Sequence, residues 1–150
     1  MILITIVQII LLIYLGFASL YIFIFGFASM FPSRRKKAIS SINRKYAVLI
    51  PGYKEDNVII EVAEDALKQD YPAELYDVVV IADSFMHETL DSLNKLPIKV
   101  IEVSFDLSTK SKALNVAMDQ LPEIYDVAIV LDADNLMEPG FISKINGAFD

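Results

Sequence analysis

The chain opens with a long apolar stretch that ends where the first charges appear. Residues 1–32 carry no charged side chain, and about 20 apolar residues suffice to cross the roughly 30 Å hydrocarbon core of a bilayer. A cleaved signal peptide would have basic residues before its apolar region and a shorter apolar region. We therefore predict a transmembrane helix over 1–32. The sequence Gly-Phe-Ala-Ser occurs at 16–19 and again at 26–29. Such small residues either let a partner helix approach closely in the membrane or only tolerate tight packing there.

After residue 45, short apolar runs rich in β-branched residues alternate with segments of helical periodicity. The apolar runs predict strands over 46–50, 77–82, 98–103 and 127–131. Apolar positions at helical spacing predict helices over 59–67, 87–95 and 113–121, and a further helix from Pro139 to Phe149. Asp56 or Asn57 stands where the cap of the first of these helices is expected. This order predicts an α/β fold in which a parallel sheet has helices on both faces and receives ligands at the carboxyl ends of its strands.

The charges divide the rest of the chain into two parts. Six of the 13 basic residues lie in 34–45, beginning with Arg34–Lys37, and basic residues beside a membrane span mark its cytoplasmic side. We expect 33–45 to be a basic juxtamembrane segment, and 46–150 a cytosolic domain, or part of a larger one, held at the inner membrane by one span. Residues 46–150 contain the other seven basic residues and all 20 acidic ones, a net charge of −13. Such a domain is a poor nucleic-acid binder.

Polar residues stand at the predicted carboxyl ends of all four strands. Asp132 and Asp134 follow the fourth strand, and two carboxylates in this position suit Mg²⁺ or Mn²⁺, which neutralises the phosphates of a nucleotide. The alternative is that they are loop aspartates that cap the next helix. No glycine-rich phosphate loop follows any strand, which argues against P-loop and dinucleotide-binding domains. Phosphate would then be held by a metal and by Lys110 or Lys112, as suits a nucleoside diphosphate leaving group.

Four segments resemble, in order, the motifs of family-2 glycosyltransferases of GT-A fold, including the membrane-bound synthases of bacterial exopolysaccharides. Val48–Glu55 resembles the opening IPAYNE segment, and Val80–Asp83 resembles a strand that ends in Asp. Lys110–Asn115 is similar to GKxxALN, and Leu131–Asp134 is similar to DxD. The resemblance covers roughly 46–149, and it implies a Rossmann-like GT-A half that binds a nucleotide sugar.

The resemblance also implies roles for individual residues. The nucleotide base and ribose would be contacted by Pro51, Gly52, Tyr53, Glu55 and Asp83. Lys110 would assist at the diphosphate, Asp132 would lie near the ribose and the metal, and Asp134 would ligate Mg²⁺ or Mn²⁺. The implied reaction is inverting transfer of a sugar to a glycan or lipid-linked acceptor. The alternatives are a packed aromatic at Tyr53, a capping residue at Glu55 and a solvated charge at Lys110; we expect His87, the only histidine, to be solvated.

Two features depart from the family pattern. Thr109 stands where the family usually has Gly, and Ser84–His87 replaces a small polar turn, so that the base pocket is expected to be altered. No QxxRW motif and no later acidic motif follow Asp134 before residue 150. We therefore assign no catalytic base, and we expect a domain truncated at its carboxyl end and inactive as a transferase by itself.

Two other functions remain open from the sequence. A phosphatase of the haloacid dehalogenase type would use Asp132 and Asp134, although its Asp pair usually follows the first strand and has Thr or Val where this chain has Leu136. A membrane-tethered nucleotide-binding module without catalysis is the non-enzyme alternative. A calcium loop is excluded, because Leu136 and Ser143 stand at ligand positions and Met137 at the turn glycine.

Overall fold

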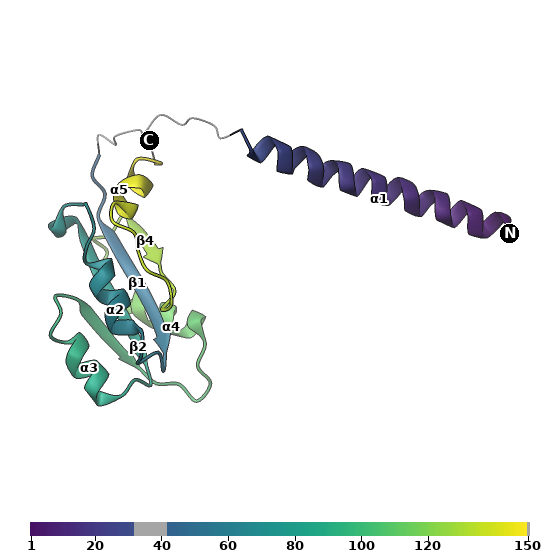
Figure 1. The fold of residues 1–150 in the computed structure, drawn as a ribbon. Helices are drawn as coiled ribbons and strands as arrows, with labels where there is room; N and C mark the ends of the chain where they lie inside the picture. Colours follow the sequence, from purple (N-terminus) through teal and green to yellow (C-terminus); the bar gives the residue numbers. More distant parts are fainter. Residues whose placement is uncertain (32–41, 150) are drawn as a thin grey trace. The chain divides into compact units, whose positions relative to one another are not determined.

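The computed structural model describes residues 1–31 and 42–149, and the chain divides into two compact units, Met1–Lys36 and Lys37–Asp150. The first unit is the helix α1 (Ile2–Ser29), shown in Figure 1. None of its side chains is buried, and its 28 residues span on the order of 42 Å at about 1.5 Å each. Among the described residues α1 alone is long and apolar enough to cross a membrane, by length and composition. The basic segment Arg34–Lys37 lies outside the described residues.

The second unit is built on a four-stranded parallel sheet of order β3-β2-β1-β4. The strands are β1 (Tyr46–Tyr53), β2 (Tyr76–Asp83), β3 (Lys99–Val103) and β4 (Val127–Val130). In the register of the sheet, Tyr46 lies opposite Tyr76 on one side and Val127 on the other. The predicted parallel α/β sheet is confirmed. Because the strand order reverses direction between β1 and β4, the carboxyl ends of these two strands flank the crevice where open α/β sheets bind ligands.

Helices cover both faces of this sheet, as predicted. They are α2 (Ile59–Ala66), the 3₁₀ helix η1 (Ala73–Leu75), α3 (His87–Leu93), α4 (Lys110–Gln120) and α5 (Phe141–Asn146). Figure 1 shows α2 and α3 in front of the sheet and α4 behind it. The last helix is shorter than predicted, because Pro139 and Gly140 form a turn in which Gly140 adopts a left-handed φ of 79°.

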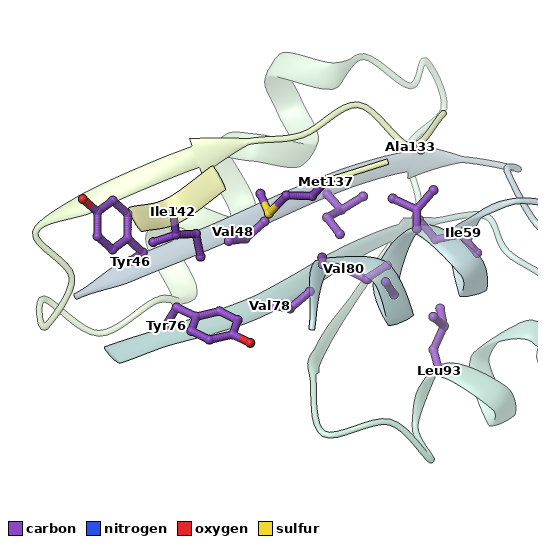
Figure 2. Packing of buried hydrophobic residues seen from close by; sticks show 14 residues of the cluster. Tyr46, Val48, Ile59, Tyr76, Val78, Val80, Leu93, Ala133, Met137 and Ile142 are labelled. Atoms are coloured by element: carbon purple, nitrogen blue, oxygen red, sulfur yellow. The ribbon is translucent and has the colours of Figure 1, made fainter. Parts of the chain in front are cut away.

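The core consists of two apolar clusters, one on each face of β1 and β2. Tyr46 and Val48 of β1 lie in one cluster with Ile59 of α2 and Ile142 of α5 (Figure 2). Ile50 belongs to the same cluster. The intervening residues face α4; this second cluster contains Ala47, Leu49, Val79, Ile81, Ile101, Ala113 and Ala117. A strand buried on both faces has no polar alternation, which explains why residues 46–50 form one continuous apolar run.

β1 extends three residues beyond its predicted end and includes Pro51. The Leu131 backbone nitrogen donates to the Leu49 carbonyl oxygen at 2.9 Å, so the Leu49 peptide groups face β4. Two residues later the Pro51 nitrogen faces the same side, where β4 has already ended, and no sheet hydrogen bond is lost. Residues 51–53, which we predicted to lie in a loop, are thus part of strand β1.

A buried asparagine ties α5 to the start of β1. Asn146 is 3% exposed. Its Oδ1 accepts from the Tyr46 hydroxyl at 3.0 Å, and its Nδ2 donates to the Ile42 carbonyl oxygen at 2.9 Å. The Arg44 guanidinium also donates to this Oδ1, at 3.4 Å. Burial raises the pKa of Tyr46, whose hydroxyl remains a donor in this network.

Candidate active site

The carboxyl ends of β1 and β2 and the start of α4 enclose a cleft of about 130 Å³. Its lining residues are Pro51, Gly52, Tyr53, Asp83, Ser108, Thr109, Lys110 and Ala113. The structure therefore brings together five of the eight residues that the sequence nominated, from segments up to about 60 positions apart. Ser108 was not nominated, and its position just before the cap of α4 is the only signal that could have indicated it.

Asp83 and Tyr53 end neighbouring strands and lie opposite each other in the register. Asp83 is 2% exposed, and its Oδ1 accepts from the Ser84 hydroxyl at 2.9 Å. A buried carboxylate on a cleft wall is suited to accept a hydrogen bond from a ligand. The Tyr53 side chain is 51% exposed, so the alternative of a packed loop aromatic is wrong, and its ring is accessible for stacking.

The chain leaves β1 and β2 through two residues in the left-handed backbone region. Lys54 has a φ of 55° and Ser84 a φ of 58°. The Lys54 nitrogen donates to the Asp83 carbonyl oxygen at 3.1 Å, and the Ser84 nitrogen donates to the Val103 carbonyl oxygen at 3.3 Å. Such conformations cost on the order of 1–3 kcal/mol each and persist where surrounding contacts impose them, often at functional sites. They turn the chain sharply after Tyr53 and Asp83.

Lys110 and Asp132 form an ion pair between the start of α4 and the end of β4. The Lys110 ammonium donates to Asp132 Oδ1, and the two side chains are 49% and 56% exposed. Lys110 is thus more than a solvated helix charge. Half-exposed pairs of this kind contribute only about 0–1 kcal/mol, so either partner can exchange the other for a phosphate or a cation at small cost.

Thr109 takes the position of the usual glycine without backbone strain. Its φ of −143° is extended, and its Oγ1 accepts from the Lys112 nitrogen at 3.3 Å. The hydroxyl therefore caps α4, which explains why α4 begins three residues earlier than the apolar pattern indicated.

Asp132 and Asp134 are exposed on either side of the buried Ala133. The Asn135 nitrogen donates to the Asp132 carbonyl oxygen at 3.0 Å, so the two aspartates lie in a turn. They do not cap the next helix, because α5 begins at Phe141 after Gly140 and has no side-chain cap. Over residues 1–31 and 42–149 no group of three or more His, Asp or Glu residues could hold a metal. Two carboxylates fit a Mg²⁺ or Mn²⁺ ion whose other ligands are diphosphate oxygens and water.

Glu55, like Asp132 and Asp134, is a nominated residue that lies outside the cleft lining. The Glu55 side chain is exposed, while its carbonyl oxygen accepts from the Val58 and Ile59 nitrogens at 3.2 and 3.1 Å at the start of α2. Its side chain does not cap α2, whose cap residue is Val58. His87 is exposed at the first position of α3, which confirms the solvated interpretation.

The predicted capping of α2 by Asp56 or Asn57 is wrong. Val58 is the cap residue, and it makes no side-chain cap hydrogen bond. The Asp56 carboxylate instead accepts from the Met86 nitrogen at 2.9 Å, across the sheet edge. A hydrogen bond from the Thr89 side chain lowers the pKa of Asp56. Asp56 therefore bonds to the residue that precedes α3, 30 positions along the chain, and not to the helix that follows it in the sequence.

Comparison with known proteins shows which family the chain matches. Residues 43–150 match the family model described as "Glycosyltransferase like family 2". Over 80 residues, 51% of this chain, the sequence is 32% identical to poly(ribitol-phosphate) beta-N-acetylglucosaminyltransferase TarS of Staphylococcus aureus. That alignment covers 14% of the relative's length.

Solved structures show the same fold. The mannosyltransferase PcManGT of Pyrobaculum calidifontis, solved with GDP-Man and Mn²⁺, matches 91% of this chain and 41% of its own, with a TM-score of 0.69 and 21% identity. Residues 1–349 of S. aureus TarS match 70% of this chain and 31% of that chain, with a TM-score of 0.56 and 27% identity. These likenesses confirm the predicted fold class.

Proposed function

Because the chain belongs to glycosyltransferase family 2, we propose that its second unit is the donor-binding part of a membrane-anchored enzyme that transfers a sugar from a nucleoside diphosphate sugar. The observation that carries this proposal is the cleft of Tyr53, Asp83 and Lys110, with Asp132 paired to Lys110 beside it. The proposed acceptor is a glycan or a lipid-linked acceptor. Family membership favours this reaction over the phosphatase alternative, and α1 is the proposed anchor in the cytoplasmic membrane.

The base and ribose would lie at the end of the cleft formed by β1 and β2. Tyr53 offers an exposed ring for stacking on the base, and the Asp83 carboxylate accepts a hydrogen bond from a base nitrogen. Pro51 and Gly52 form the wall between them in β1. Since these residues belong to strands, the base would be read by a rigid surface.

The diphosphate would lie at the end of the cleft formed by α4 and the turn after β4. Lys110 would exchange Asp132 for a phosphate oxygen, which would free Asp132 to hold Mg²⁺ or Mn²⁺ together with Asp134. The metal, when bound, neutralises the charge that develops on the departing diphosphate. An inverting transfer also requires a base that takes the proton of the acceptor hydroxyl, and no described residue is assigned that role.

We propose a uridine diphosphate sugar as the donor to test first. TarS is named as an N-acetylglucosaminyltransferase, and its residues 1–349 were solved with UDP-GlcNAc. Guanosine diphosphate is the appropriate comparison, because PcManGT was solved with GDP-Man.

The test is calorimetric titration of the full chain, reconstituted in lipid nanodiscs, with UDP and GDP in Mn²⁺ or in chelator. We expect UDP to bind in Mn²⁺ and to bind at least about tenfold more weakly in chelator, since the metal neutralises the diphosphate. Asp134→Ala should abolish the metal-dependent part of the affinity. Asp119→Ala, an exposed aspartate near the far end of α4, is the matched control and should change nothing.

Two outcomes contradict separate parts of the proposal. Equal affinity with and without chelator would contradict the proposed metal requirement and leave the proposed nucleotide site unaffected. Absence of binding of either nucleotide under both conditions would contradict the proposed donor site.

A further inference from the structure

We propose that Asp56, which lies outside the cleft, is a positioning residue that holds the loop after β2 in the conformation needed for donor binding; this role rests on the proposed function of the cleft. The loop comprises Ser84, Phe85 and Met86, between the end of β2 and the start of α3. Asp56 belongs to a different segment, three residues after the end of β1.

The Asp56 carboxylate joins the two strand exits through a hydrogen bond, in which its Oδ1 accepts from the Met86 nitrogen at 2.9 Å. The side chain of Thr89, which is buried, further stabilises the ionised carboxylate and lowers its pKa. Hydrogen bonds to an ionised carboxylate are shorter and stronger than those between neutral groups. Met86 is the residue that precedes α3, and its side chain makes no cap hydrogen bond to the helix. Asp56 supplies the acceptor for the backbone nitrogen of Met86 at the start of this helix.

The loop that Asp56 holds contributes directly to the shape of the cleft. A Cβ atom placed on Gly52 would lie 2.7 Å from Phe85 Cζ and 3.7 Å from Ala133 Cβ. The Phe85 ring therefore lies against the cleft residue Gly52, close to the alanine between Asp132 and Asp134. A displacement of Met86 moves its neighbour Phe85. The Phe85 ring would then no longer pack in the same way against Gly52 of the cleft and near Ala133, which lies between the two proposed metal ligands.

The backbone of this loop also requires an external restraint. Ser84 adopts a φ of 58°, a conformation that a non-glycine residue keeps only when its surroundings impose it. The Ser84 nitrogen is held by the Val103 carbonyl oxygen on one side, and Met86 is held by Asp56 on the other. Without the carboxylate, the Met86 nitrogen loses its partner, and the loop can relax toward a commoner conformation at Ser84.

The experiment compares Asp56→Ala and Asp56→Asn in the full chain in nanodiscs, with UDP and uridine monophosphate as probes. Asp56→Ala should weaken UDP binding by about tenfold, the effect of leaving the loop without its acceptor, and it should weaken uridine monophosphate binding similarly. Asp56→Asn should stay within about threefold of the unmodified chain, because its amide oxygen still accepts from the Met86 nitrogen. Asp65→Ala, which removes the ion pair between Asp65 in the last turn of α2 and Lys68 beyond the helix, is the control and should bind UDP normally.

Hydrogen exchange gives the readout that separates positioning from general stability. In Asp56→Ala, peptides that cover residues 84–90 should exchange faster, while those from β1 and β2 should keep their protection. Should Asp56→Ala not fold, Thr89→Val removes the hydroxyl that stabilises the Asp56 carboxylate and should weaken UDP binding about threefold in the same assay.

Three results would overturn the role of Asp56: UDP affinity within twofold of the unmodified chain, an Asn variant as weak as the Ala variant, or faster exchange throughout the sheet. Failure of the unmodified chain to bind any nucleotide would instead overturn the proposed function. The two failures are thereby distinguishable.

Discussion

At Gly52 the backbone of β1 passes so close to the Phe85 ring that no side chain fits between them. The clash distance of 2.7 Å to an added Cβ is shorter than real Cβ contacts, and the obstacle is a partly buried ring. The requirement for glycine here is therefore one of space.

We predict that Gly52→Ala lowers the free energy of unfolding by about 1–3 kcal/mol, the usual cost of overpacking a well-packed site, and weakens UDP binding. Urea-dependent pulse proteolysis and calorimetry of the reconstituted chain measure the two effects. Phe85→Leu in the same background should recover part of both losses, because the shorter side chain leaves room for the methyl group. Gly147→Ala is the control, since Gly147 has the ordinary helical φ of −68°. Normal binding and stability of Gly52→Ala would show that the ring moves aside freely.

At the scale of elements, α5 is a short helix whose position depends on side-chain contacts with the start of β1. Besides the apolar contact of Ile142, Asn146 connects it to Ile42, Arg44 and Tyr46. A helix of six residues is not stable by itself, so these contacts decide where it lies.

Asn146→Ala should lower the free energy of unfolding by about 1–3 kcal/mol, because it leaves the buried Tyr46 hydroxyl and the Ile42 carbonyl oxygen without this partner. Pulse proteolysis in urea measures the loss, and hydrogen exchange should show it first in α5. Asn94→Ala, at an exposed position after α3, serves as the control and should cost much less. An Asn146→Ala chain as stable as the unmodified one would mean that the apolar contacts of α5 and its hydrogen bonds to Gln69 and Asp70 suffice to hold it.

At the scale of the whole molecule, a strongly acidic domain follows an uncharged helix, with a basic segment between them. All 33 charged side chains lie after residue 32, and Arg34–Lys37 begins directly beyond the apolar stretch. Positive charge next to a span is retained on the cytoplasmic side. We therefore predict that the amino terminus lies outside and the domain inside.

Fusions of green fluorescent protein and of alkaline phosphatase after Asp150 test this orientation in bacteria. The first should be fluorescent and the second inactive, since the phosphatase becomes active only after export. Replacing Arg34–Lys37 with four glutamines should raise the exported fraction several-fold, as expected when charge bias sets the orientation. Replacing Lys95 and Lys99 with glutamine is the control, because both lie far along the sequence from the span. This change should leave the exported fraction as it is. Strong phosphatase activity of the unmodified fusion would reverse the assignment.

The sequence by itself was sufficient for the features that depend on neighbouring residues. An uncharged apolar stretch predicts α1, and continuous apolar runs predict β1 and β2, because burial on both faces removes polar positions from these two central strands. The ends of the elements were less predictable. β1 continues through Pro51 because β4 ends early, and α5 is short because Gly140 turns the chain.

Only the tertiary structure decided which distant residues meet. Strand order places the exits of β1, β2 and β4 at one edge, and this order brings Lys110 to Asp132 and Asp56 to Met86. These partners are 22 and 30 residues apart, and nothing in the local pattern around any of them indicates the pairing. The residue types and their strand-end positions were therefore readable from the sequence, whereas their contacts were not, because a contact across a sheet edge depends on the packing of the whole sheet.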